Sequence, residues 1–365
     1  MILMNDFKAE PEALIQKQLA ATERVFRSGW YILGKELQAF ETKWAARCGA
    51  AQAVGVGNGM DALEIGMQAL GIGPGDEVIT TPMTAFASTL AILRVGATPV
   101  FADIDPTTAL LDPASVQRCI TSKTKAVLLV HLYGRSGDMD LWVDLCRERK
   151  FLLIEDACQA HLSAWKGRKV GTFGAFGAFS FYPTKNLGAI GDGGMLTTQD
   201  EELAKKARIL RNYGQSQRYH HPEIGLNSRL DEIQAAILSE RLEWLNGFTI
   251  RRREIASALW EGLHNPKIMP MARPGHPENH VNHLFVVLCN RRDELSAFLK
   301  DRSIDNLIHY PVPVHMQKPC EGLARDPKGL SVSESHAQRC LSVPCHPQMS
   351  AADVKAIIGA LNEFK

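Results

Sequence analysis

Residues 151–198 read FLLIEDACQAHLSAWKGRKVGTFGAFGAFSFYPTKNLGAIGDGGMLTT, and this segment indicates the class of fold. Its first residues, Phe151 to Ile154, form a continuous apolar run, as in strands buried on both faces of a parallel sheet. The acids Glu155 and Asp156 follow where that strand is expected to end. Open α/β sheets bind their ligands at this edge, so the segment predicts a ligand site beside Asp156.

Lys185 lies between an apolar, aromatic segment and the glycine-rich turn of residues 188–194. Loop lysines are usually solvated. Here the neighbours are apolar and no run of charges surrounds the lysine, so we expect burial to lower its pKa and free the amine to form a Schiff base. A carboxylate at a strand end can keep a pyridinium nitrogen protonated. The pair Asp156 and Lys185 therefore predicts pyridoxal phosphate (PLP) as cofactor.

The length of 365 residues exceeds what a single hydrophobic core usually serves, which favours two domains. The composition shifts past Gly247, and proline and histidine cluster between residues 266 and 283, so we place the division after residue 250. Residues 1–250 are expected to form a large PLP-binding domain with an N-terminal helical segment. Residues 251–365 are expected to form a smaller α+β domain.

Charge and cysteine content exclude several classes of protein. The net charge of +1 offers no surface for nucleic acid or an anionic membrane. No apolar run is long enough to cross a bilayer, and residues 1–4 are too short for a signal peptide. The 8 cysteines show no C-x-x-C spacing, so we expect neither a metal site nor a disulfide framework. These features suit the reducing cytoplasm.

Expected strands and helices alternate through the first two thirds of the chain. Strands are expected at 53–56, 77–80, 98–101, 126–130 and 151–154, and helices at 9–27, 35–48, 84–95, 113–120, 141–150, 200–210 and 230–245. This alternation predicts a mostly parallel central sheet with helices on both faces. Asn227 or Ser228 is the expected N-cap of the last helix, and a further strand is expected at 283–288.

A glycine turn, Gly57-Asn58-Gly59, connects the strand at 53–56 to a helix. Such a turn presents backbone N–H groups to a phosphate. A dinucleotide fingerprint requires glycine where this chain has Met60, and no acidic residue closes a second strand about 20 residues on. The turn therefore favours a phosphate cup over an NAD site, with a simple tight turn as the other interpretation.

Six segments together carry a resemblance to a known family. They are Ser28–Gly34 (SGWYILG), Gly57–Leu63 (GNGMDAL), Glu155–Ala160 (EDACQA), Ser180–Gly188 (SFYPTKNLG), Gly225–Asp231 (GLNSRLD) and Tyr310–His315 (YPVPVH). In this order and spacing the chain resembles, over nearly its whole length, the DegT/DnrJ/EryC1/StrS family of PLP-dependent nucleotide-sugar aminotransferases. The resemblance implies PLP-dependent transferase fold type I, like aspartate aminotransferase, and a homodimer with shared active sites.

The resemblance also implies roles for single residues. Lys185 would form the Schiff base and act as general acid and base, with Asp156 as the partner of the pyridine nitrogen. Gln159 would bind the ring oxygen of the cofactor. The phosphate would be bound by Ser180, by the backbone at Gly59 and Met60, and by Asn227 from the second subunit. The implied substrate contacts are Tyr31, His161, Tyr182, Arg229, His309, Tyr310 and His315; no metal is implied.

The implied reaction moves an amino group from L-glutamate to a nucleotide-linked keto sugar. The residues at Trp30–Gly34 and at Gln159–His161 are similar to those of the family branch that aminates C3 of a dTDP-3-oxo-6-deoxyhexose. This reaction would serve amino-sugar biosynthesis for a surface polysaccharide or a glycosylated metabolite. One alternative is amination at C4. Another is a PLP-dependent sugar dehydratase, against which Lys185 argues because such relatives replace the lysine. A third is a PLP-binding regulator without turnover, for which no basic DNA-binding segment exists.

Three positions depart from the family pattern. Met60 stands where threonine is usual, so the phosphate cup would depend more on backbone N–H groups and Ser180. Ala85 stands where an aromatic residue often stacks on the pyridoxal ring. Either Phe86, one place on, covers that ring through a changed loop, or another side chain covers it. Leu162 replaces a common glycine, which would change the shape of the sugar pocket.

Overall fold

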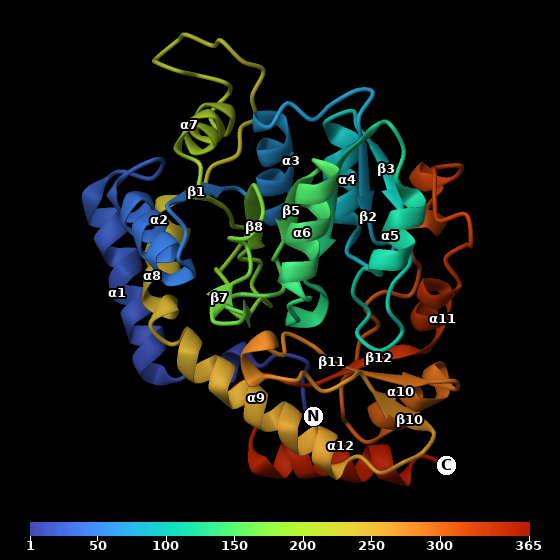
Figure 1. The fold of residues 1–365 in the computed structure, drawn as a ribbon. Coiled ribbons are helices and arrows are strands. Elements are labelled where there is room, and N and C mark those ends of the chain that lie inside the picture. Colours follow the sequence, from blue (N-terminus) through green and yellow to red (C-terminus); the bar gives the residue numbers. More distant parts are fainter.

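A sheet of 7 strands forms the centre of the molecule in the computed structural model, which describes residues 1–365 (Figure 1). The strands are β1 Gln52–Val56, β2 Glu77–Thr80, β3 Thr98–Phe101, β4 Thr124–Val130, β5 Leu152–Asp156, β8 Phe176–Ser180 and β9 Gly194–Thr198, in the order β1-β9-β8-β5-β4-β2-β3. All neighbours run parallel except β9, which is antiparallel to both β1 and β8. The mostly parallel sheet is confirmed.

Helices cover both faces of this sheet. They are α1 Glu12–Ser28, α2 Lys35–Cys48, α3 Gly59–Ala69, α4 Phe86–Arg94, α5 Pro113–Cys119, α6 Met139–Arg149, α7 Glu201–Leu210 and α8 Glu232–Leu242. The pleat of β4 separates two cores: Leu128 packs in the cluster that includes α3 and α4, whereas Val127 packs in the cluster that includes α5 and α6. A strand buried on both faces is therefore apolar throughout, which is why the continuous apolar runs predicted this sheet.

Among the element boundaries that differ from the expectation, two bear on the site. The strand β5 continues through Asp156, so both acids belong to the strand itself. The helix α8 begins at Glu232, with Asp231 as its N-cap, so the expected capping by Asn227 or Ser228 is wrong. The Ser228 hydroxyl instead accepts from the backbone N of Gly57 at 2.9 Å and donates to Asp61 at 2.6 Å. Because its hydroxyl is engaged in these tertiary contacts, Ser228 does not cap α8.

A smaller antiparallel sheet of 3 strands lies in the C-terminal third, in the order β10-β11-β12. Its elements are α9 Leu245–Gly262, β10 Ile268–Pro270, β11 Phe285–Cys289, α10 Arg292–Asp301, α11 Ser331–Arg339, β12 Cys340–Val343 and α12 Ala351–Glu363, and a two-stranded ribbon of β6 Ala164–Trp165 and β7 Arg168–Lys169 completes the strands. The N-terminal Ile2 pairs with Ile304. The expected boundary after residue 250 falls inside α9, and the division into two domains stays a prediction.

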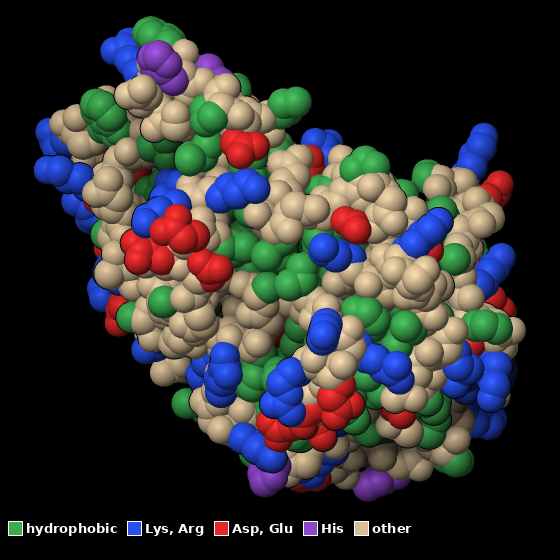
Figure 2. Space-filling model, turned by 45° about the horizontal axis from the view of Figure 1, so that its top comes forward, with side chains coloured by type: hydrophobic (Ala, Val, Ile, Leu, Met, Phe, Trp, Pro, Cys, Tyr) green, Lys and Arg blue, Asp and Glu red, His purple; other side chains and the backbone are tan.

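The surface mixes charges of both signs. Figure 2 shows basic and acidic side chains side by side over one face, without a broad field of either sign. None of the helices combines the length and apolar character that a membrane crossing requires.

Candidate active site

A cavity of about 260 Å³ opens at the carboxyl end of β5. The starts of α3 and α4, the end of β5 and the loop after β8 line it. Its lining residues are Asn58, Gly59, Met60, Leu63, Thr84, Ala85, Ala87, Ser88, Val130, Asp156, Cys158, Gln159, Ser180, Tyr182, Lys185 and Asp192. The structure thus brings together Gly59, Met60, Asp156, Gln159, Ser180, Tyr182 and Lys185, as the sequence predicted.

Lys185 sits on the loop that connects the neighbouring antiparallel strands β8 and β9. The backbone N of Phe181 donates to the carbonyl of Gly193 at 2.7 Å, and the N of Ala189 donates to the carbonyl of Phe181 at 2.7 Å. These bonds fix both ends of the loop. Burial lowers the pKa of the Lys185 amine, and the nearby Cys158 and Asp156 oppose that shift only in part. A larger fraction of the amine is therefore uncharged than in a solvated lysine.

The two acids of β5 serve opposite faces of the strand. Glu155 is fully buried and accepts the backbone N–H groups of Gly171, Phe173 and Gly174 at 2.7, 2.7 and 2.9 Å. Its contact with the His131 ring is 3.0 Å. Because successive side chains of a strand alternate, Asp156 points to the other side, where it lines the cavity. Glu155 thus holds the residue 171–174 segment against β5, whereas Asp156 faces the cavity.

The first turn of α3 has the geometry of an anion-binding cup. Asn58 caps this turn by accepting from the N–H of Asp61 at 2.9 Å. The N–H groups of Gly59 and Met60 have no acceptor within the helix, as at every helix start, and both residues line the cavity. A Cβ on Gly59 would lie 2.6 Å from Cys158 Sγ and 2.8 Å from Ser180 Cβ. Only glycine therefore fits this close approach.

The orientation of the Gln159 side chain is set by two neighbours. Its Oε1 accepts from the backbone N of Tyr133 at 2.7 Å, and its Nε2 donates to the Tyr310 hydroxyl at 3.1 Å. One amide hydrogen of Gln159 remains available to a ligand. Burial raises the pKa of Tyr310 to about 12, so its hydroxyl stays protonated. Tyr310 thus contacts the cavity through Gln159.

Several predicted residues lie outside the cavity lining. Phe86, the expected ring cover, packs beside Phe101 and Val314, while Ala85 and Ala87 line the cavity on either side of it in sequence. Asn227 is exposed and does not reach the cavity of its own chain. Tyr31 is also exposed. The roles proposed for these residues stay predictions.

The predicted histidines are likewise separated. His161 is fully buried between aromatic rings. Burial lowers its pKa to about 3. Its Nε2 contacts the carbonyl of Ser180 at 2.9 Å. His309 contacts the Ser342 hydroxyl at 2.8 Å and lines a neighbouring cavity of about 60 Å³. His315 contacts Glu334 at 3.1 Å. None of these three histidines lines the cavity at the carboxyl end of β5.

Arg229 donates to Asn212 at 2.9 Å and stacks near the Tyr213 ring. It carries no carboxylate partner in the structure and lies two residues from Asn227. Its predicted contact with substrate stays a prediction.

Sequence reasoning assigned no role to several lining residues, among them Thr84, Ser88, Cys158 and Asp192. Thr84 and Ser88 are four residues apart at a helix start that follows a strand end, which is the one signal that would have placed both hydroxyls at the site. Cys158 is the one cysteine that is not buried.

Residues 12–362 match the family model described as the DegT/DnrJ/EryC1/StrS aminotransferase family, and the chain belongs to that family. It is an aminotransferase with the fold of these enzymes.

Two curated relatives are similar over almost the whole chain. The dTDP-3-amino-3,4,6-trideoxy-alpha-D-glucose transaminase of Streptomyces venezuelae is 45% identical over 98% of this chain and 95% of its own. The dTDP-3-amino-3,6-dideoxy-alpha-D-galactopyranose transaminase of Aneurinibacillus thermoaerophilus is 44% identical over 96% of each.

Solved structures agree with these relatives. Streptomyces venezuelae DesV in complex with a ketimine intermediate superposes with a TM-score of 0.95 at 44% identity, covering 99% of this chain and 98% of that one. NtdA from Bacillus subtilis, with bound cofactor PMP, has a TM-score of 0.90 at 28% identity and covers 99% and 84%. The fold and the family therefore match the expectation from the sequence.

Proposed function

We propose that this enzyme transfers an amino group from L-glutamate to C3 of a dTDP-linked 3-oxo-6-deoxyhexose, in amino-sugar biosynthesis. The observation that carries the proposal is the similarity, over at least 95% of each chain, to two transaminases whose names specify dTDP-3-amino sugars. The reducing cytoplasm is the proposed location, on the cysteine pattern alone.

The cavity fits PLP or its amine form, PMP, as resident cofactor. The tight approach at Gly59 and the unpaired N–H groups of Gly59 and Met60 suit a phosphate. The Asp156 carboxylate suits a protonated ring nitrogen, and the free amide hydrogen of Gln159 suits the ring oxygen. The Lys185 amine, its pKa lowered by burial, suits a carbonyl carbon.

Each residue then has a defined task. When bound, the cofactor supplies an electron sink that stabilises a carbanion next to the transferred nitrogen. Lys185 removes the proton from the carbon that carries this nitrogen and returns one, as its uncharged amine allows. Asp156 holds the ring nitrogen in its charged form. Ser180 and the α3 turn bind the phosphate and fix the ring for both half-reactions.

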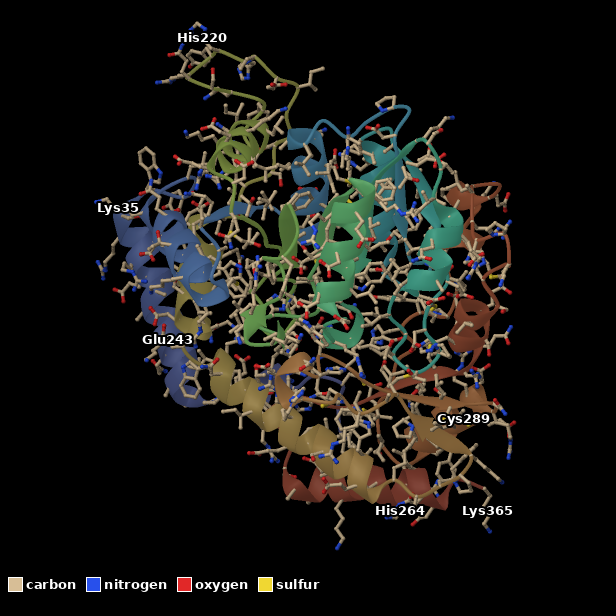
Figure 3. The ribbon with its side chains drawn as sticks, in the orientation of Figure 1. Lys35, His220, Glu243, His264, Cys289 and Lys365 are labelled. Carbon is tan, nitrogen blue, oxygen red and sulfur yellow. The ribbon has the colours of Figure 1, made fainter.

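We also propose that the active enzyme is a homodimer in which Asn227 of one copy reaches the phosphate cup of the other. The segment between α7 and α8 stands out from the body, with His220 at its far end (Figures 1 and 3). It carries apolar side chains in solvent, with Tyr219 77% and Ile224 92% exposed. A groove of about 450 Å³ between α1, α8 and the lysine loop is also partly apolar. A second copy of the chain would cover both surfaces.

The first test measures cofactor binding and the first half-reaction. PLP added to the purified protein should give a visible absorption band at a position distinct from that of free PLP, and L-glutamate should bleach it. Lys185→Ala should abolish the band, whereas Lys166→Ala, at an exposed lysine paired with Asp140, should leave it intact. A wild-type protein without the band, or a Lys185→Ala protein that keeps it unchanged, would contradict the proposal.

The second test fixes the position of amination. The PMP-loaded enzyme is mixed with a panel of 3-oxo and 4-oxo nucleotide sugars, and the return of the PLP band is followed. We expect a response to 3-oxo dTDP sugars. A response to 4-oxo sugars alone would replace C3 by C4, and a deoxygenated product would indicate a dehydratase.

The third test concerns the shared site. Lys185→Ala and Asn227→Ala proteins are each expected to be inactive or weakly active, and their mixture should recover activity after subunit exchange. Recovery requires that the two residues act on one site from different subunits. Light scattering gives the mass of the assembly, and a monomer with full activity would contradict the dimer.

A further inference from the structure

A row of two hydroxyl groups ends on the Asp156 carboxylate. The Ser88 Oγ lies 2.7 Å from Asp156 Oδ2, and the Thr84 Oγ1 lies 2.8 Å from Ser88 Oγ. All three side chains are almost completely buried, at 1% exposure for Ser88, 3% for Thr84 and 6% for Asp156. All three line the cavity proposed for the cofactor. The row is therefore part of the site wall and is shielded from bulk water.

The chemistry of the groups fixes the direction of the hydrogen bonds. An ionised carboxylate only accepts, so the Ser88 hydroxyl must donate to Asp156. The single hydroxyl hydrogen of Ser88 is already donated to Asp156, so Thr84 must donate to Ser88 Oγ. The other carboxylate oxygen, Oδ1, accepts from the backbone N of Cys158 at 3.1 Å. One donor on each oxygen prevents the carboxylate from rotating.

The fold brings these groups together from distant parts of the sequence. Strand β2 ends at Thr80, and α4 starts at Phe86 directly after the turn that contains Thr84. Asp156 is the last residue of β5, separated from β2 in the sheet by β4. The start of α4 thus leans over the carboxyl edge of the sheet and reaches the acid. No capping duty accounts for Ser88, because its hydroxyl bonds no backbone group of α4.

We propose that Ser88 and Thr84 are positioning residues that hold the Asp156 carboxylate in the one orientation that meets the ring nitrogen of the cofactor. This inference rests on the proposed function, because it requires a pyridine cofactor at Asp156. The hydroxyl row could have either of two roles, and these roles predict different ligand preferences. A row that only satisfies a buried acid would support any ligand of the cavity equally, whereas a row that aims the acid supports only a ligand with nitrogen at that place.

The test compares PLP with an analogue whose ring nitrogen is replaced by carbon. Dissociation constants for both compounds are measured on the cofactor-free wild type, on Ser88→Ala and on Thr84→Val by titrating the visible band. Ser88→Ala should weaken PLP binding about tenfold and Thr84→Val about threefold, the losses expected for one direct and one indirect hydrogen bond. Binding of the analogue should stay within about twofold of wild type in both variants.

A matched control is available on the same helix. Thr89 is fully buried on α4, and its hydroxyl has no hydrogen-bond partner. Thr89→Val, of nearly the same shape, should therefore change the affinity for neither compound. Thermal unfolding of each cofactor-free variant shows whether that variant is folded. If Ser88→Ala does not fold, the affinities of Thr84→Val for PLP and for the analogue still test the inference.

Equal weakening of PLP and of the analogue would overturn the inference, since it would mean a structural role only. Unchanged PLP affinity in both variants would overturn it as well. Both results leave the proposed function intact, because wild type still binds PLP. A wild type that binds no PLP at Lys185 would instead remove the proposed function and this inference together.

Discussion

Close contacts between single atoms determine the shape of the active-site cavity. The clearest case is Gly59, where the first turn of α3 passes against Cys158 and Ser180. The approach is possible because glycine has no Cβ, and it places this turn in the wall of the cavity. The proposed phosphate contact depends on this close approach more than on any side chain.

The substitution Gly59→Ala tests this contact. Its Cβ would lie 2.6 Å from Cys158 Sγ, so the turn or Ser180 must move. We expect PLP affinity to fall about a hundredfold, since the loss of one or two hydrogen bonds to a charged phosphate costs about 3 kcal/mol. Titration of the visible PLP band measures it.

Gly247→Ala serves as the control for Gly59→Ala. A Cβ at this position of α9 meets no atom within 4 Å. Alanine there should raise the free energy of unfolding by up to about 1 kcal/mol and leave PLP affinity unchanged. Equal affinities in the two variants would show that the α3 turn tolerates a side chain.

At the scale of elements, one carboxylate joins two helices. Glu232, in the first turn of α8, is 2% exposed and accepts the backbone N–H groups of Gly34, Glu36 and Leu37 at 2.9, 2.9 and 3.0 Å. These groups belong to the start of α2, whose N-cap Gly34 has no side chain to cap it. The cap is thus supplied from a distant helix, and α2 and α8 are fixed to each other.

We expect Glu232→Ala to lower the free energy of unfolding by about 2 to 4 kcal/mol, because three N–H groups lose their acceptor in a buried place. Chemical denaturation measures the change. Glu243→Ala is the control: Glu243 is exposed at the other end of α8 (Figure 3), and its loss should cost no more than about 0.5 kcal/mol. Similar losses in both variants would contradict the capping role.

The sequence predicted elements best where a local pattern is decisive. Helix α2 and strands β2 and β3 have the expected bounds because apolar runs, glycine stops and alternation act within a few residues. The start of α8 was missed because Ser228 bonds to Asp61, far away in sequence. The same reason hid Ser88 as a partner of Asp156. Lys185 and Asp156 were predictable because each has a local environment that is unusual for its type.

At the scale of the whole molecule, buried acids attach the C-terminal segment to the large sheet. Asp326 accepts from Arg118 Nε at 2.9 Å and from the Ser115 hydroxyl. Asp103, at the end of the large sheet, accepts the N–H groups of Val332 and Ser333 at 3.0 and 2.9 Å. These contacts connect α5 with the segment before α11, and the end of β3 with the first turn of α11 itself.

The link at Asp326 predicts a pH dependence of stability. The hydrogen bond from Arg118 is the main cause that lowers the pKa of Asp326 to about 2. A lowered pKa gives stability above the unfolded value near 3.9, which is lost as the pH falls toward 2. Asp326→Asn should therefore lower the free energy of unfolding by about 1 to 3 kcal/mol at pH 7. The difference from wild type should shrink between pH 4 and pH 2, as thermal melts at each pH would show; a constant difference would contradict the link.

The antiparallel strand β9 has a consequence for biosynthesis of the chain itself. β1 pairs only with β9, so Gln52 finds its partner Thr198 only after that residue has been made. During synthesis on the ribosome, β1 and the first turn of α3 that follows it stay unpaired until most strands of the sheet have been made. Pairing over such a sequence distance is slow to form. The nascent chain therefore completes the cavity proposed for the cofactor late, as one of the last events of folding.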